Sequence, residues 1–206
     1  MDYSEDEQLE KLKAWWKSYG NALIAGVALG LAVLFGGRYW QHQQAENAAE
    51  ASALFDQMVY SIHEKNNNNV TAAGTKIIND YARTPYAGLA ALMLARENYD
   101  HDEKEKAKKQ LAWAIDNARE DGVRQVARLR LARIQLADDN VAGPEQLLKE
   151  EPIVGFELEF YELKGDVLKK KGDIDGARAA YGKAIAHAVS AGKYLDKLQM
   201  KIDDLG

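Results

Sequence analysis

The sequence predicts an all-α protein: a single N-terminal transmembrane helix, then an α-solenoid of about four helix pairs and a C-terminal capping helix. Two features of this 206-residue chain carry the prediction. One is an uncharged stretch of 20 residues, Ser18 to Gly37. The other is a small residue that recurs through the rest of the chain at intervals of 33 to 37 residues. The composition agrees, because only three prolines are present to interrupt helices.

The uncharged stretch has the length of a membrane span, because 20 helical residues cover about 30 Å. Aromatic residues that favour the membrane–water interface flank both ends: Trp15, Trp16, Tyr19, Tyr39 and Trp40. A cleaved signal peptide would have a shorter apolar region followed by small residues, whereas this run ends in Arg38-Tyr39-Trp40. A buried core helix is rarely free of charge over such a length. We therefore predict an uncleaved anchor over residues 18–40.

Basic residues near the two ends predict the orientation of this anchor. The N-terminal flank carries Lys11, Lys13 and Lys17, whereas Arg38 is the only basic residue on the other side before Lys65. Lysine and arginine are enriched on the cytoplasmic side of membrane helices. Residues 1–17 are therefore predicted to be cytoplasmic, and residues 41–206 to lie across the membrane.

Small residues also mark one face of the anchor, because Ala22, Gly26 and Gly30 recur every fourth residue. Such spacing lets a second membrane helix approach closely. The sequence therefore predicts a helix–helix contact on this face. The alternative is that glycine and alanine are simply common in membrane helices.

The rest of the chain shows no sign of catalysis or of nucleic-acid binding. Beyond the anchor, 27 acidic residues outnumber 23 basic ones, and no basic block is present. The chain has no cysteine, and its four histidines (His42, His63, His101 and His187) lack metal-ligand spacing. No phosphate-binding loop, nucleophile elbow or zinc-protease motif occurs. We therefore expect no enzyme activity, cofactor, metal or small-molecule substrate.

After the anchor, residues 41–65 are predicted to continue as a helix. Their apolar residues form a stripe made of Leu54, Phe55, Met58, Val59 and Ile62. Asn66 to Asn69 should end this helix, and we interpret the asparagine run as a solvated loop. At the other end of the chain, residues 193–205 are predicted to form a capping helix. Its apolar positions are Leu195, Leu198, Ile202 and Leu205.

Four units between these ends follow one pattern: a small residue on a first helix, a turn, and then small and large residues on a second helix. The small positions are Ser61, Ala95, Ala132 and Gly165. In the last unit, Gly165 is followed by Gly172-Asp173 and then by Ala177, Tyr181 and Ala184. The pattern resembles the tetratricopeptide repeat, although Lys164 stands where the consensus has leucine. Pro144 replaces the expected alanine of the third unit, so its second helix should start late and be short. An unrelated helical bundle is the alternative.

In tetratricopeptide stacks the first helix of each pair lines a concave groove, and this resemblance predicts a partner-binding surface. The expected groove residues are Phe55, Met58, Ile62, Leu89, Leu92, Arg96, Tyr99, Val126, Leu129, Arg133 and Leu136. Such a groove would be apolar with two arginines, and would suit an extended or helical segment that carries an acidic side chain. The alternative is that many of these residues belong to the core, because a one-residue error in register moves the whole set.

The order of anchor and repeats resembles one family, the ancillary SecYEG translocon subunits of Gram-negative bacteria. The resemblance rests on five segments: residues 37–40, 86–90, 129–135, 172–178 and 199–205. It implies an inner-membrane protein with a periplasmic repeat domain, beside the SecYEG translocon and linked to periplasmic chaperones, without catalytic residues. The alternatives are an envelope enzyme, or an envelope scaffold or stress-response regulator that is independent of the translocon.

Overall fold

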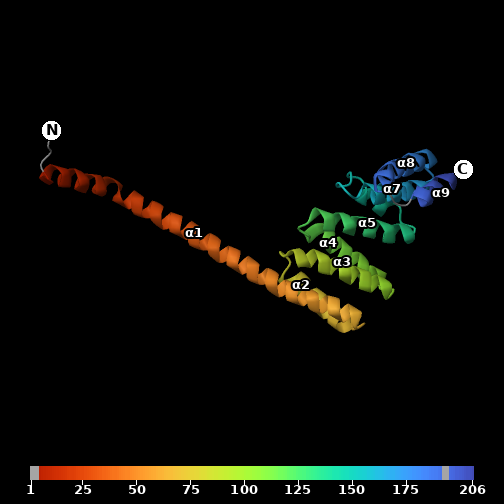
Figure 1. Ribbon diagram of the computed structural model, residues 1–206, viewed down its shortest axis with the longest axis horizontal. Coiled ribbons are helices and arrows are strands. Elements are labelled where there is room, and N and C mark those ends of the chain that lie inside the picture. Colours follow the sequence, from red (N-terminus) through yellow and green to blue (C-terminus); the bar gives the residue numbers. More distant parts are fainter. Residues whose placement is uncertain (1–4, 192–194) are drawn as a thin grey trace. The chain divides into compact units, whose positions relative to one another are not determined.

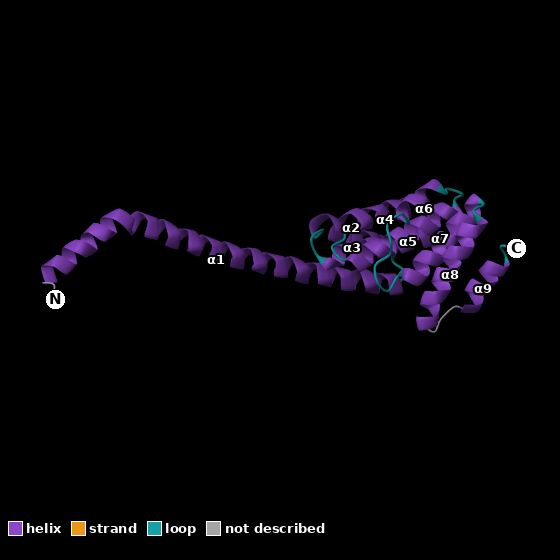
Figure 2. Ribbon diagram, turned by 90° about the horizontal axis from the view of Figure 1, so that it is seen from above, coloured by secondary structure: helices purple, strands orange, loops and turns teal. Residues whose placement is uncertain are grey.

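The computed structural model describes residues 5–191 and 195–206, and every element among them is a helix (Figure 2). The side chains of residues 5, 6, 22, 27 and 189–191 lie outside this description. The helices are α1 Glu5–His63, α2 Asn67–Asp80, α3 Pro85–Asp100, α4 Lys104–Asn117, α5 Asp121–Ala137, α6 Ala142–Leu147, α7 Glu157–Lys171, α8 Ile174–Ala191 and α9 Leu195–Asp203. The chain divides into two compact units, residues 1–47 and 48–206.

The first unit consists of the N-terminal part of α1. Within the described residues, one segment is long and apolar enough to cross a membrane, and it begins at Leu23 in this helix. Apolar side chains such as Leu29 and Phe35 are about two-thirds exposed, since no described part of the chain covers them. This is the pattern that a lipid-facing helix requires.

On the predicted small-residue face, Gly26 and Gly30 have open space beside them. The side chain of Ala22 lies outside the described residues. A methyl group placed on Gly26 or Gly30 would meet no described atom within 4 Å. This face is therefore open within the chain, and its contact with another membrane helix stays a prediction.

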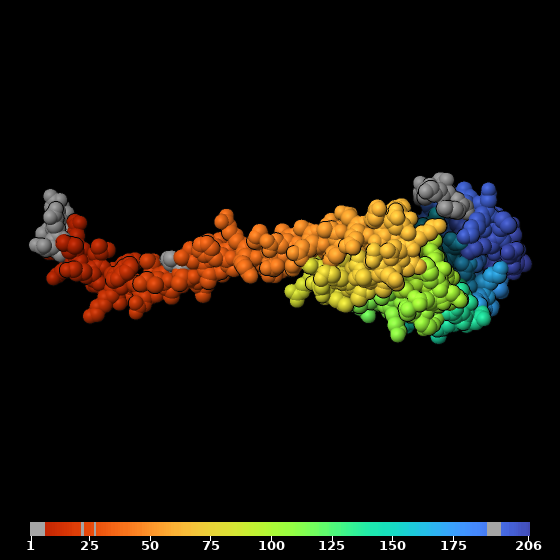
Figure 3. Space-filling model, turned by 90° about the horizontal axis from the view of Figure 1, so that it is seen from below, coloured from red at the N-terminus to blue at the C-terminus, as the bar shows by residue number. Residues whose placement is uncertain are grey.

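The second unit is a stack of helix pairs. The C-terminal end of α1 packs against α2 through Met58, and α3 contacts α4, α5 contacts α6, and α7 contacts α8. Figures 1 and 3 show these pairs following one another in sequence order, with α9 beside α7 and α8. This arrangement confirms the predicted solenoid, in which each pair contacts mainly its neighbours.

The recurring small residues are buried, and at Gly165 this burial lies where the two helices of a pair meet. Ser61, Ala95, Ala132 and Gly165 are all buried. So are small and large residues on the second helices or at their ends: Ala73, Ile77, Ala107, Leu111, Ala114, Pro144, Leu148, Ala177, Tyr181 and Ala184. The closest approach is at Gly165, where an added Cβ would lie 2.4 Å from Cε1 of Tyr181.

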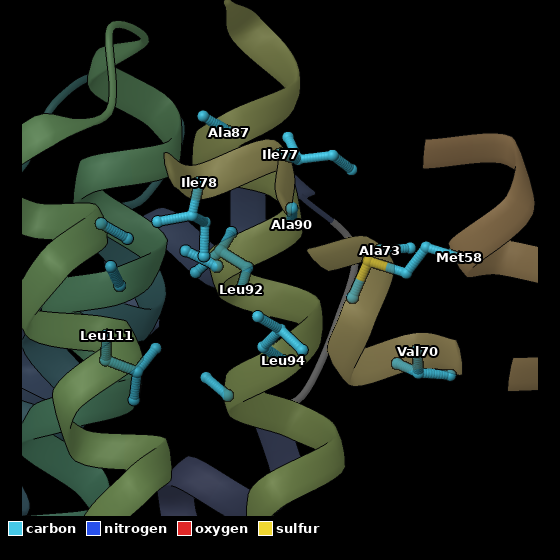
Figure 4. Packing of buried hydrophobic residues seen from close by; sticks show 14 of the residues in the cluster. Met58, Val70, Ala73, Ile77, Ile78, Ala87, Ala90, Leu92, Leu94 and Leu111 are labelled. Atoms are coloured by element: carbon cyan, nitrogen blue, oxygen red, sulfur yellow. The ribbon is translucent and has the colours of Figure 1, made fainter. Parts of the chain in front are cut away.

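The buried side chains form two cores along the stack. The first contains Met58, the apolar residues of α2 and α3, and Leu111 on α4, and extends to Leu131 on α5. Figure 4 shows Met58 reaching from α1 to Ala73 on α2. The second core begins with Leu129 and Ala132 on α5 and runs to Leu198 on α9. Helix α5 therefore contributes to both cores.

Three details differ from the sequence predictions or complete them. The asparagine run is not a loop: Asn66 is the N-cap of α2, and its side chain accepts a hydrogen bond from the backbone N–H of Asn69 at 3.2 Å. Helix α6 is short, as Pro144 predicted, with six residues. The capping helix α9 buries Leu198 but leaves Leu195 exposed, and residues 193 and 194 lie outside the described residues.

Candidate functional site

A cavity of about 410 Å³ lies between the first helices of the second and third pairs. Its lining comes from α3 (Ala95, Arg96, Tyr99 and Asp100), α4 (Leu111) and α5 (Arg130, Arg133 and Ile134). The floor is apolar, because Ala95 and Leu111 are buried. The rim carries three guanidinium groups and one carboxylate, so the cavity combines an apolar surface with an excess of positive charge.

The carboxylate of Asp100 pairs with only one of the three arginines. Its Oδ2 accepts a hydrogen bond from Nε of Arg96 at 2.5 Å, which raises the pKa of Arg96. Among the described residues, neither Arg130 nor Arg133 has an ion-pair partner. Arg130 is exposed as a whole residue, yet partial burial lowers the pKa of its guanidinium, and the charges of Arg96 and Arg133 lower it further. The positive charge here is therefore only partly neutralised.

A second cavity, of about 530 Å³, continues from Arg133 and Leu136 on α5 to α7 and α9. Here both lining carboxylates, Glu162 and Asp166, are paired with lysines of α9. Nζ of Lys201 lies 2.7 Å and 2.8 Å from the carboxylate oxygens of Asp166 and 2.8 Å from Oε1 of Glu162. Lys197 also pairs with Glu162, at 2.9 Å. These bonds fix α9 against α7, so the carboxylates here are already occupied by lysines of the same chain.

The predicted groove residues divide into three groups by exposure. Leu89, Arg96, Tyr99 and Arg133 are exposed, and Phe55, Ile62, Val126 and Leu136 are half-buried. Met58, Leu92 and Leu129 are buried, so they belong to the core and not to an open surface. The cavity between α3 and α5 brings together Arg96, Tyr99 and Arg133, whereas Arg133 and Leu136 also line the second cavity.

The prediction for α5 missed one arginine. It placed Leu129 on the groove, whereas the structure places Arg130 there, beside Arg133 and Ile134. Residues three and four apart share a helix face, so Val126, Arg130 and Arg133 lie together and Leu129 turns toward the core. The signal was present in the sequence as an i, i+3 pair of arginines.

The structure offers no metal centre within the described residues, since no group of three or more histidine and acidic side chains could hold an ion there. His101 lies at the C-terminal end of α3, as its C-cap residue. Its Nδ1 lies 2.7 Å from the carbonyl oxygen of Glu97, and its Nε2 contacts the side-chain amide of Asn67. The contact with Asn67 ties the end of α3 to α2, which is a structural role.

Comparison with known proteins agrees with the observed repeat fold. Residues 13–206 match the family described as tetratricopeptide repeat-like domain. The chain is 32% identical to the ancillary SecYEG translocon subunit of Escherichia coli (strain K12), over 98% of this chain and 97% of that relative. It is 27% identical to the protein of that name from Haemophilus influenzae over the full length of both, and 25% identical to that of Neisseria gonorrhoeae over 98% and 97%. No solved structure is significantly similar to it. With an apolar N-terminal helix, four helix pairs and relatives that align from end to end, the chain belongs to the family of ancillary SecYEG translocon subunits.

Proposed function

We propose that this protein is a non-catalytic interaction subunit of the inner membrane, which associates with the SecYEG translocon and links translocated proteins to periplasmic chaperones. The observation that carries the proposal is the partly neutralised arginine cavity between α3 and α5, on a repeat domain that follows an apolar helix. Repeat domains of this kind present extended surfaces to other polypeptides. The names of its relatives place those proteins at the translocon.

The proposed topology has residues 1–17 in the cytoplasm, residues 18–40 in the membrane and residues 41–206 in the periplasm. The support is the ratio of three lysines to one arginine across the apolar stretch. Alkaline phosphatase fused after residue 60 should be active, and after residue 10 inactive. The reverse result would place the repeat domain in the cytoplasm and remove it from any periplasmic partner.

The two units have separate roles in this proposal. The face formed by Ala22, Gly26 and Gly30 meets a membrane helix of the translocon, because small residues permit close helix contact in lipid. The surface formed by the predicted groove residues, which we call the inner face, binds the periplasmic partner through its exposed residues, chiefly Arg96, Tyr99 and Arg133. Location and partner choice thus depend on different parts of the chain.

Affinity purification of the membrane-intact protein in a mild detergent tests this function. Translocon subunits and a periplasmic chaperone should co-purify with the unaltered chain. The variant Arg96→Glu/Arg133→Glu should keep the translocon subunits and lose the periplasmic protein. Purification of a different membrane complex without translocon subunits would instead indicate an envelope scaffold or a stress-response regulator that is independent of the translocon.

A further inference from the structure

We infer that the cavity between α3 and α5 receives an acidic side chain of a partner segment. An apolar residue next to that acidic residue packs against Tyr99 and Ile134. Asp100 competes with the incoming carboxylate for Arg96. The inference rests on the proposed function, because it names the chemistry of the segment that the inner face binds. It adds a residue of this chain, Asp100, that opposes binding.

Charge complementarity identifies the occupant as acidic. Three arginines line the cavity and one carboxylate faces them, and among the described residues Arg130 and Arg133 have no acidic partner. The neighbouring cavity shows the contrasting case, because Lys201 there is matched by Glu162 and Asp166. Guanidinium groups bind carboxylates through two parallel hydrogen bonds, so a glutamate or aspartate is the side chain that this rim suits. A basic segment would be repelled.

The size and lining of the cavity favour a segment with an apolar residue beside the acidic one. A volume of about 410 Å³ holds a few side chains and not a folded domain. Tyr99 is 42% exposed at one edge, and Ile134 is half-buried at the other. Their apolar surface lies next to the guanidinium groups, so a carboxylate and an adjacent apolar side chain can be bound together.

Asp100 limits the affinity for such a segment. Among the described residues, no other acidic side chain lines the cavity, and the bond between Asp100 and Arg96 is an i, i+4 pair with both side chains substantially exposed. Exposed pairs of this kind contribute little to stability, so an incoming carboxylate can displace Asp100 from Arg96. Until it is displaced, Asp100 occupies one guanidinium and repels the ligand. Removing its charge should therefore strengthen binding.

The test uses the full-length protein in detergent micelles and fluorescent peptides of about ten residues with blocked ends. One peptide has the central sequence Glu-Phe-Glu, and the matched peptide has Gln-Phe-Gln. Fluorescence anisotropy should show that the glutamine peptide binds at least about tenfold more weakly. Arg130→Gln and Arg133→Gln should each weaken binding of the glutamate peptide about five- to tenfold, since each removes one carboxylate contact.

The decisive variant is Asp100→Asn, which should tighten binding of the glutamate peptide about two- to fivefold, the range expected for one exposed charge pair. Its matched control is Asp80→Asn, because Asp80 forms the same kind of i, i+4 pair with Lys76, at 3.0 Å on α2. The control should leave the affinity unchanged. An increase in binding cannot result from a folding defect, so this arm remains informative if an arginine variant proves unstable.

Three results would overturn the inference. Equal binding of the glutamate and glutamine peptides would show that the cavity does not select acidic side chains. Unchanged or weaker binding by Asp100→Asn would show that Asp100 is not a competitor. Binding that requires an unblocked peptide C-terminus would identify a chain end as the occupant in place of a side chain. None of these results depends on the translocon, so the proposed function, which is tested by co-purification, can succeed or fail separately.

Discussion

Replacing Gly165 by alanine should destabilise the repeat domain, although alanine is the better helix former. The added Cβ would lie 2.4 Å, 2.5 Å and 2.9 Å from three ring carbons of Tyr181, all far below ordinary contact distance. The ring cannot move freely, because Tyr181 is fully buried and its hydroxyl donates a hydrogen bond to Oδ1 of Asp166 at 2.8 Å. The helices must therefore separate, or the tyrosine must lose its position.

The size of the effect follows from three contributions. Overpacking a core costs about 1–3 kcal/mol. A lost Tyr181–Asp166 hydrogen bond costs about 1 kcal/mol more. The higher helix propensity of alanine offsets about 1 kcal/mol of this sum. The net loss should be about 1–3 kcal/mol, which for a domain of this size lowers Tm by about 3–8 °C.

Thermal unfolding of the full chain in detergent, followed by circular dichroism, measures this loss. The matched control is Gly182→Ala on α8, where an added Cβ would meet nothing within 4 Å. The control should raise Tm slightly, because it gains helix propensity without a clash. If Gly165→Ala raises Tm as the control does, then α7 and α8 do not approach closely at this point, and the account of the small-residue position is wrong.

Three further predictions concern the apolar N-terminal helix, the inner face, and the ion pairs that join α9 to α7. Gly26→Leu/Gly30→Leu should reduce cross-linking to a membrane partner and leave the Tm of the repeat domain unchanged; a lowered Tm would mean that this face supports the fold. Arg96→Glu/Arg133→Glu should change the free energy of unfolding by no more than about 0.5 kcal/mol, because both side chains are exposed, and a loss as large as that of Gly165→Ala would make them structural. Burial raises the pKa of Glu162, but hydrogen bonds from Lys201 and Lys197 outweigh it, so the pKa lies below the ordinary value. The stability that Glu162 gains from Lys201 and Lys197 is therefore present above about pH 4.5 and is lost as pH falls through the pKa of Glu162 in the folded state. The difference in Tm between the unaltered chain and Glu162→Gln should shrink over that pH range. A difference that stays constant would contradict this prediction.

The sequence was sufficient to predict the helical architecture because the signals were local or regularly spaced. The length of the uncharged stretch indicates the anchor without any knowledge of packing. The repeat positions are similarly visible, since small residues recur at a regular interval, and Ser61, Ala95, Ala132 and Gly165 are all buried. Pro144 likewise signals a short second helix in the third pair.

The inner face was harder to predict because its composition depends on helix rotation. A shift of one residue on α5 exchanges Leu129, which is buried, for Arg130, which lines the cavity. The asparagine run presented a different difficulty, because the same residue type ends helices and caps them, and here Asn66 caps α2. The bond from Lys201 to Asp166 joins residues 35 positions apart, so nothing local in the sequence indicated it.

The division of the buried side chains into two cores has a consequence for how the domain opens. Helix α5 faces both cores, and its partner α6 has only six residues, so the third pair contributes the least second-helix surface to the stack. In a linear array, separation begins where the contact between neighbours is smallest. We expect the segment from α7 to α9 to detach as one cooperative block while α1 to α4 stay folded. Proteases should then cut first in the loop after α6, where Val154 is 92% exposed, and leave an N-terminal fragment that resists further digestion.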